Sequence, residues 1–284
     1  MISKDSKILI IGLGLIGGSY AEALTNKGYK VSAITRTQSS VDYALEQGII
    51  EKGYSYVNEE AVKEADIVIF GLYPSLILNW LEENQHLFKS GAVITDVTGV
   101  KSCIVYDIQK LLRDDVEFIS AHPMAGREVY GVENSDSSIF KGANYIVVPT
   151  DKNTESATEL CKALGKELGF EHISVLSPEE HDDIIGFVSQ LTHCIAVSLM
   201  TCNDNEELVN YTGDSFRDLT RIARINENMW SELFMMNKEA LLRQMNAFID
   251  EFTDIRDMIK TENVEELKEK MRLSTKRRAL FDKK

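Results

Sequence analysis

The sequence predicts an α/β protein in which a doubly wound parallel sheet, residues 1–177, precedes an all-α domain, residues 178–284. Three observations predict this organisation. Short apolar runs alternate with helical stretches in the first part, which is typical of parallel strands joined by crossover helices. The first apolar run leads into a glycine-rich loop and a helix. Beyond Pro178 the strand patterns stop and only helical periodicity remains.

The glycine-rich loop follows the first predicted strand, residues 8–11, and reads Gly12-Leu13-Gly14-Leu15-Ile16-Gly17. The first glycine permits a tight turn, the second lets the backbone approach a pyrophosphate, and the third lets the new helix pack against the strand. Free N–H groups at the helix start then face the phosphates. The flanking strand and helix favour a Rossmann-type dinucleotide site over an ordinary turn. The expected cofactor contacts in this loop are Gly12, Gly14, Leu15, Ile16 and Gly17.

The remaining elements follow from the same patterns. Further strands are predicted at residues 30–34, 65–70, 92–97, 116–121, 145–149 and 172–176, all in one sheet. The helices between them are predicted up to Lys27 and at residues 41–47, 59–64, 74–87, 100–112 and 154–168. In the second domain, helices are predicted at residues 179–202, 206–225, 229–260 and 264–280.

Composition limits the classes of protein. The 284 residues are 44% hydrophobic and 27% charged, which is sufficient for two domains with buried cores. A net charge of −14 without long basic runs argues against a nucleic-acid partner. The four cysteines lack CxxC or metal-ligand spacing, so free thiols in a reducing cytoplasm and no metal site are expected. The apolar stretch at residues 8–18 is too short to span a membrane and has no signal-cleavage flank, so a cytoplasmic protein is expected.

Ligands of doubly wound sheets bind beyond the carboxyl ends of the strands. The polar residues at those ends are Tyr73, Thr98, Lys101 and His122, and Tyr73 is expected to contact the cofactor. His122 is followed by Pro123, which favours an extended backbone, and then by small residues that leave room for a ligand. The alternative is a histidine with a purely structural hydrogen bond at a strand end.

The helical domain offers two further groups of candidates. Asp182, Gly186, Ser189 and His193 share one face of the first helix, and the glycine leaves a gap that suggests a pocket. The alternative is an ordinary helix–helix contact. Arg217, Arg221 and Arg224 also share a face near the break at Gly213-Asp214, where an arginine can bind a carboxylate, although such a stripe is often only solvated.

Five motifs, in this order and separation, resemble those of the prephenate and arogenate dehydrogenases of tyrosine biosynthesis over nearly the whole chain. They are residues 12–19, residues 96–101, His122-Pro123-Met124-Ala125-Gly126, Ser189-Gln190-Leu191-Thr192-His193, and residues 216–223 followed by Met229-Trp230. The resemblance implies a cofactor domain, a helical domain that forms a homodimer, and oxidative decarboxylation of prephenate to 4-hydroxyphenylpyruvate. Arogenate, which has an amine in place of the keto group, is the alternative substrate. A nucleotide-sensing regulator without catalysis is the alternative from another class.

The resemblance also implies roles for individual residues. His122 is similar to the histidine that binds the ring 4-hydroxyl and accepts its proton while hydride leaves C4 for the nicotinamide. Arg221 resembles the arginine that binds the substrate carboxylate, with Ser189 and His193 in the same pocket and Trp230 beside it. No regulatory segment fits the remaining length, so any feedback by tyrosine is expected to act at the active site.

The chain departs from the family pattern at several positions. Gly99 stands where a serine usually binds the catalytic histidine, and Thr98 is expected to supply that hydroxyl instead. Gln190 and Thr192 replace the commoner His and Pro. Arg127 stands where a small hydroxyl residue is usual, and a change in substrate preference is expected from it.

The end of the second strand predicts the choice of cofactor. An NAD site usually places Asp or Glu about twenty residues after the glycine loop, but this chain has Thr35 there and no carboxylate before Asp42. Arg36 can bind a 2′-phosphate, with the Thr37 and Ser39 hydroxyls beside it. NADP is therefore predicted. In the alternative, Arg36 only stacks on the adenine, and NAD serves as well.

Overall fold

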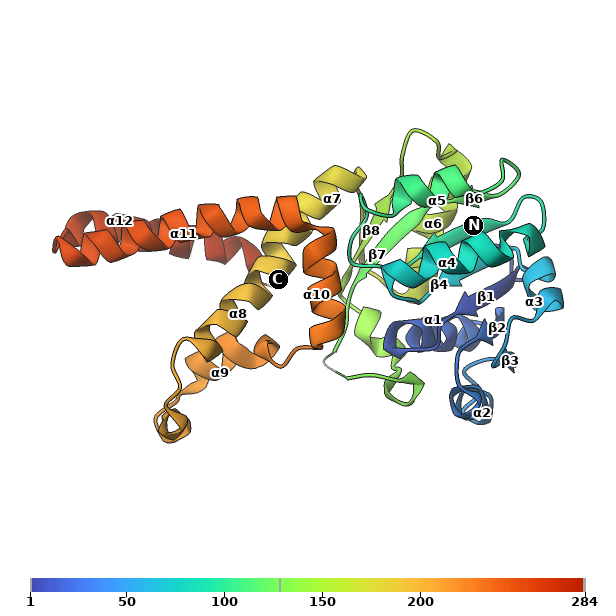
Figure 1. Ribbon diagram of the computed structural model, residues 1–284, viewed down its shortest axis with the longest axis horizontal. Coiled ribbons are helices and arrows are strands. Elements are labelled where there is room, and N and C mark those ends of the chain that lie inside the picture. Colours follow the sequence, from blue (N-terminus) through green and yellow to red (C-terminus); the bar gives the residue numbers. More distant parts are fainter. Residues whose placement is uncertain (1, 128, 283–284) are drawn as a thin grey trace. The chain divides into compact units, whose positions relative to one another are not determined.

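The computed structural model describes residues 2–127 and 129–282 of the chain. The chain forms two compact units, residues 1–237 and residues 238–284. The first unit contains both β-sheets and most of the helices (Figure 1). The domain boundary predicted at residue 177 lies where the strands end and the helices begin, and it stays a prediction.

The first sheet is parallel throughout and has the strand order β3-β2-β1-β4-β5-β6. Its strands are β1 (Lys7–Ile11), β2 (Lys30–Ile34), β3 (Lys52–Tyr54), β4 (Ile67–Phe70), β5 (Val93–Asp96) and β6 (Glu117–Phe118). The chain runs outward from β1 in one direction and then from β4 in the other, so the order reverses between these two central strands. The predicted doubly wound fold is confirmed, although β3 was not predicted.

Helices cover both faces of this sheet. They are α1 (Leu15–Asn26), α2 (Gln38–Glu46), α3 (Glu59–Glu64), α4 (Pro74–Asn84) and α5 (Val105–Leu111). Alternate side chains of β1 point to opposite faces, so Ile8 and Ile10 join the core beneath α1 while Leu9 and Ile11 join the core beneath α4 and α5. This alternation of buried residues holds the loop after β1 between two cores.

A second, three-stranded sheet contains strands that the sequence predicts in the first sheet. They are β7 (Ser120–Met124), antiparallel to β8 (Asn144–Val148), which is parallel to β9 (His172–Val175); α6 (Glu155–Leu168) lies between β8 and β9 in the chain. The predicted single strand at residues 116–121 is therefore wrong. The hydrogen bonds between β6 and β5 end where the Ile119 N–H donates to the Ile94 carbonyl oxygen. The Ser120 hydroxyl and the Ala121 N–H donate instead to the Asp96 carboxylate. That carboxylate directs the chain out of the first sheet.

The helical part of the first unit is more broken than predicted. Its elements are α7 (Pro178–Ile185), a π-helix (Gly186–Leu191), α8 (Thr192–Thr201), α9 (Asp214–Thr220) and α10 (Glu227–Met236). The predicted helix at residues 206–225 is wrong, because only short 3₁₀ turns flank α9 and its backbone is extended at Gly213. The predicted helix at residues 229–260 divides at Asn237, whose side chain binds the backbone of Asp182 and the side chain of Gln190 instead of facing solvent.

The second unit consists of α11 (Lys238–Lys260), α12 (Val264–Arg278) and a final 3₁₀ turn. The chain reverses between the helices at Glu262, which has a positive φ of 55°. Lys270 on α12 forms an ion pair with Glu251 on α11 at 2.8 Å. Large apolar side chains remain exposed on both helices, among them Phe252 and Met271.

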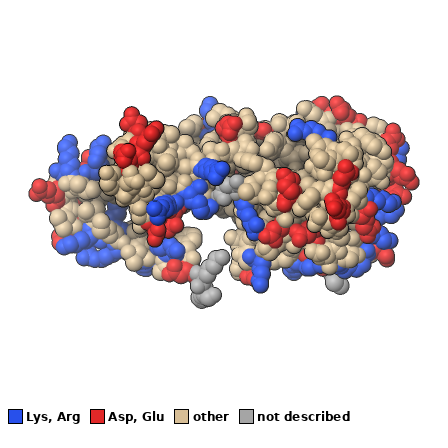
Figure 2. Space-filling view, turned by 90° about the horizontal axis from the view of Figure 1, so that it is seen from below, with Lys and Arg blue, Asp and Glu red and all other residues tan. Residues whose placement is uncertain are grey.

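The surface and one helical run bear on the possible partners. Basic and acidic side chains are interspersed over the face of the molecule that Figure 2 displays. Within the described residues, one helical run, Pro178–Thr201, has the length and apolar composition of a membrane span, and 28% of its apolar window is buried. The same composition occurs in helices that are covered by other protein.

Candidate active site

The loop between β1 and α1 has the geometry that a dinucleotide requires. Gly12 has a φ of 101°, and a Cβ there would lie 2.6 Å from the Gly71 carbonyl oxygen. A Cβ on Gly17 would lie 2.0 Å from the Gly12 oxygen, so the helix can pack this closely only with glycine. A Cβ on Gly14 would meet open space, and α1 has no side-chain cap. The first N–H groups of α1 are therefore available to a phosphate.

A cleft of about 540 Å³ lies in front of this loop. Its walls come from the glycine loop, from the segments after β4 and β5, from β7 and the loop that follows it, and from the helical part of the first unit. The predicted site residues that line it are Gly14, Leu15, Ile16, Gly17, Tyr73, Thr98, His122, Ser189 and His193. The cleft therefore joins the carboxyl ends of the strands to the π-helix and α8.

Other predicted residues lie outside the walls of the cleft. Thr35 is next to the glycine loop, where its hydroxyl accepts from the Leu13 N–H at 3.4 Å. Arg36 and Thr37 follow on the surface. Arg221 is exposed and does not line the cleft, whereas Arg224 does. The substrate role of Arg221 therefore stays a proposal.

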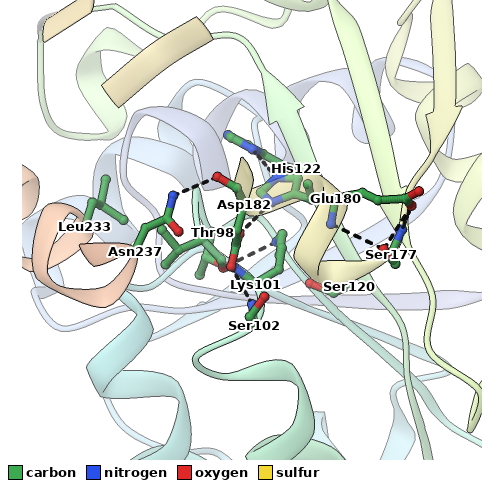
Figure 3. A network of polar contacts seen from close by, with 12 residues as sticks. Thr98, Lys101, Ser102, Ser120, His122, Ser177, Glu180, Asp182, Leu233 and Asn237 are labelled. Atoms are coloured by element: carbon green, nitrogen blue, oxygen red, sulfur yellow. Dashed lines mark hydrogen bonds and ion pairs between the residues drawn. The ribbon is translucent and has the colours of Figure 1, made fainter. Parts of the chain in front are cut away.

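His122 contacts a second histidine, His181, which no motif in the sequence marks. The Nδ1 of His122 lies 2.9 Å from Nε2 of His181, and Nδ1 of His181 lies 2.8 Å from Oδ1 of Asp182. Figure 3 shows His122 and Asp182 in this network of polar contacts. His181 is completely buried on α7 and Asp182 nearly so. The contact between His122 and His181 spans 59 residues, so no local spacing in the sequence signals it.

Burial dominates the electrostatics of the two histidines. It lowers the pKa of His122 well below 6.5, and the neighbouring His181 and Lys101 lower it further. The pKa of His181 is also lowered by burial, against the hydrogen bond that His181 donates to Asp182, which raises it. His122 is therefore neutral at pH 7 and able to accept a proton.

A buried ion pair lies behind His122. The Lys101 ammonium binds Asp96 at 2.8 Å and the carbonyl oxygen of Ala121 at 2.7 Å, and both charged side chains are fully buried. The Asp96 carboxylate also binds Ser120. Because Ser120 and Ala121 directly precede His122 on β7, this pair fixes the backbone that carries the histidine.

Thr98 does not supply the hydroxyl that was expected beside His122. Its hydroxyl is paired with Asp96, with the carbonyl oxygen of Val100 and with the Lys101 ammonium, and His122 is not among its partners. The charged pair behind the cleft binds this hydroxyl more strongly than a neutral imidazole would. Thr98 therefore belongs to the support of the site.

Gly99 leaves the reactive edge of His122 open. A Cβ at this position would lie 3.8 Å from both Nε2 and Cε1 of the imidazole, and equally far from Leu233. These contacts are ordinary van der Waals distances, so a small side chain would fit. As the chain stands, His122 and Gly99 both line the cleft, and the Thr98 hydroxyl of this loop is paired elsewhere.

The π-helix builds the opposite wall. Nδ1 of His193 donates to the Ser189 carbonyl oxygen at 2.9 Å, and its ring lies 3.7 Å from the Trp230 ring, centroid to centroid. Gln190 is buried and its amide binds the Leu233 carbonyl oxygen and the Asn237 side chain. The extra residue in a π-turn brings Ser189, Gln190 and His193 to the same cleft.

Arg127 lies at the cleft on the loop after β7. Its guanidinium forms an ion pair with Asp136 at 2.6 Å, and the backbone N–H of Asp136 donates to the Ser19 hydroxyl on α1. Gly18 permits this approach, because a Cβ there would lie 2.9 Å from Cβ of Ser135. The loop that carries Arg127 is thus bound to the helix of the dinucleotide motif.

A dinucleotide loop, a neutral histidine and a cleft between them define a nicotinamide-dependent oxidoreductase. Family models agree: residues 20–174 match the prephenate dehydrogenase nucleotide-binding domain, and residues 177–273 match the prephenate dehydrogenase dimerization domain. The chain belongs to the prephenate dehydrogenase family.

Individual relatives support this assignment. The chain is 33% identical over 273 residues to a prephenate dehydrogenase of Bacillus subtilis, covering 93% of this chain and 72% of that protein. It is 34% identical over 250 residues to a prephenate dehydrogenase of Lactococcus lactis, covering 85% of this chain and 68% of that protein. The structure of a prephenate dehydrogenase from Aquifex aeolicus, in complex with hydroxyphenyl propionate and NAD⁺, superimposes with a TM-score of 0.89 at 29% identity and covers 99% of each chain.

Proposed function

We propose that the chain converts prephenate to 4-hydroxyphenylpyruvate and CO₂ with reduction of a nicotinamide cofactor. The observation that carries the proposal is the position of His122, a neutral histidine that lines the cleft in front of the dinucleotide loop, with its Nε2 beside Gly99. The named relatives from Bacillus subtilis and Lactococcus lactis support the same reaction.

The residues of the chain divide the chemistry between them. His122 accepts the proton of the ring 4-hydroxyl as a hydride leaves C4. A base positioned in this way increases the rate of such a step by about 10²–10⁴-fold. The bound nicotinamide supplies the hydride acceptor. Cleavage of the bond to the ring carboxylate releases CO₂ and makes the ring aromatic, and His122 returns its proton to the phenol oxygen. The uncapped start of α1 and the open space at Gly14 fit the pyrophosphate of the cofactor.

The charges of the cleft favour prephenate over arogenate. Arg127 and Arg224 line it, and none of its described lining residues is an Asp or Glu. Both substrates have two carboxylates that gain from arginines, but only arogenate has an ammonium group, and a site for that group would gain from a carboxylate that the described lining residues lack. We propose that Arg221, from the family resemblance, and Arg224, from its position, bind these carboxylates.

The deciding experiment offers the purified enzyme both substrates. We expect kcat/KM for prephenate to exceed that for arogenate by at least tenfold. A higher value for arogenate would reassign the substrate, and binding of cofactor without turnover of either substrate would instead favour the sensor alternative.

We propose NADP as the preferred cofactor. Arg36 is exposed just after β2, and its guanidinium has no hydrogen-bond or ion-pair partner within residues 2–127 and 129–282. Thr37 and Ser40 form a hydrogen bond at 2.7 Å at the start of α2. A free guanidinium beside a helix start suits a 2′-phosphate, which an acidic residue would repel.

We also propose a cytoplasmic homodimer that uses no metal. The match of residues 177–273 to a dimerization domain supports the dimer. The helical run at residues 178–201 exposes Ile184, Phe187, Val188 and Met200, each more than 40% accessible. A second copy of the chain would cover such a surface. Sedimentation at micromolar concentration tests this, and a monomer would contradict it.

A further inference from the structure

Three side chains form a hydrogen-bonded path from a buried carboxylate to the cleft. Asp182 binds Nδ1 of His181, whose Nε2 binds Nδ1 of His122. His181 is fully buried and is not one of the described residues that line the cleft. Which nitrogen of each imidazole carries a proton follows from the state of Asp182 at the buried end of the path.

Asp182 accepts hydrogen bonds on both oxygens. Oδ1 accepts from the backbone N–H of Lys101 at 2.9 Å, and Oδ2 accepts from the backbone N–H of Ser102 at 2.8 Å. Burial acts to raise the pKa of Asp182, but the hydrogen bonds from His181 and Ser102 outweigh it and the pKa lies below its ordinary value. The carboxylate is ionised, so Nδ1 of His181 carries a proton and donates it.

His181 carries this proton only. Burial and the Lys101 ammonium hold its pKa below 6.5 despite the hydrogen bond with Asp182. A neutral imidazole that is protonated on Nδ1 has a lone pair on Nε2. The 2.9 Å contact with His122 then requires that Nδ1 of His122 donates. Nε2 of His122 is consequently unprotonated.

We propose that His181 is a positioning residue that holds His122 in the tautomer whose Nε2 accepts the substrate proton. The other tautomer would set two lone pairs against each other across the buried contact. Because Gly99 provides no hydroxyl beside Nε2, the orientation of the imidazole depends on its Nδ1 side. The inference rests on the proposed proton transfer to His122.

The same path accommodates the proton once it is transferred. Protonated His122 keeps its Nδ1–H bond to His181, and the ionised Asp182 faces the new positive charge through one imidazole ring. Lys101 is paired with Asp96 but still opposes a positive charge on His122, so the ionised Asp182 is the group in this path that offsets the charge. The arrangement resembles the logic by which a carboxylate and an imidazole orient a catalytic base.

Two substitutions at one position separate the role of the acceptor from mere packing. His181→Phe removes the acceptor but fills the space, and we expect it to lower kcat about 10²-fold with KM unchanged within about threefold. His181→Gln can present an amide oxygen to Nδ1 of His122, and we expect it to recover kcat to within about tenfold of wild type. His172→Gln, at an exposed residue of β9, is the control and should change neither constant.

Nitrogen-15 NMR of histidine-labelled protein reads the tautomer directly, because the chain has only five histidines. In the wild type we expect His122 to show a protonated Nδ1 and an unprotonated Nε2, and in His181→Phe a mixture of tautomers. A wild-type His122 protonated on Nε2, or a tautomer unchanged by His181→Phe, would overturn the proposal. This spectrum is independent of turnover, so a protein inactive on prephenate would refute the proposed function without deciding the tautomer.

Discussion

The two walls of the cleft are built in different ways. The cofactor wall is made of backbone, where three glycines set the turn, the open approach and the helix packing within six residues. The substrate wall is made of side chains from distant segments, such as His122 on β7, His181 on α7 and Trp230 on α10. The first can be read from local sequence, and the second exists only after the chain has folded.

This difference has a consequence for substitution. A backbone site tolerates no added atom where the chain is close-packed, but its chemistry does not depend on which side chains surround it. A side-chain site tolerates changes of volume at an open position such as Gly99, yet each polar partner that is lost alters the chemistry. Substitutions in the two walls should therefore fail in distinguishable ways.

The largest expected effect is on the substrate wall, at His122 itself. His122→Asn should lower kcat by about 10²–10⁴ with little change in KM, because a base acts mainly in the transition state. Steady-state kinetics with prephenate measure both constants. A kcat close to that of the wild type would exclude the histidine as the base.

The cofactor wall is tested by a matched pair of alanines. Gly17→Ala would place a Cβ 2.0 Å from the Gly12 oxygen, so we expect it to lower the free energy of unfolding by about 1–3 kcal/mol and to abolish cofactor binding. The added Cβ in Gly14→Ala meets open space, so this variant should keep its free energy of unfolding within about 0.5 kcal/mol of the wild type and lose only affinity for the cofactor. Denaturant unfolding and cofactor titration separate the two effects, and equal stabilities for the two variants would refute the packing argument.

The arginines of the substrate wall should affect binding more than rate. Arg221→Ala and Arg224→Ala are each expected to raise KM for prephenate about 10-fold to 100-fold with a smaller change in kcat, since a carboxylate is charged in ground and transition states alike. The exposed Arg217, which is paired with Asp214, offers a control substitution. An arginine whose loss leaves KM unchanged has no part in binding the substrate.

The smallest expected effect concerns Arg36, which acts on the cofactor through one exposed contact. The wild type should have a higher kcat/KM with NADP⁺ than with NAD⁺, and Arg36→Ala should reduce that ratio by about tenfold. If NAD⁺ is preferred by the wild type, or the ratio does not move, the NADP proposal is wrong.

Local patterns predicted most of the fold. The strand at residues 30–34 and the helix at residues 59–64 have the predicted bounds, because a buried parallel strand and a capped short helix are specified by their own residues. Where tertiary contacts decide, the predictions failed. The Asp96 carboxylate ends one sheet and starts the next, and Asn237 ends a helix that periodicity alone would continue.

The site shows the same limit. His122 stood out because a strand end, a proline and small residues surround it in sequence. His181 did not, since its meaning comes from a partner 59 residues away and from burial that only the folded chain provides. Thr98 was assigned to the wrong partner because sequence cannot show that Lys101 and Asp96 meet behind it.

The pH dependence of kcat/KM for prephenate tests the central claim, that neutral His122 is the base. Activity requires the unprotonated imidazole, and burial lowers its pKa, so activity should fall only as the pH drops well below 6.5. The residual activity of His122→Asn should lack this acidic limb. An acidic limb that persists unchanged in the variant would assign the titration to another group and contradict the account.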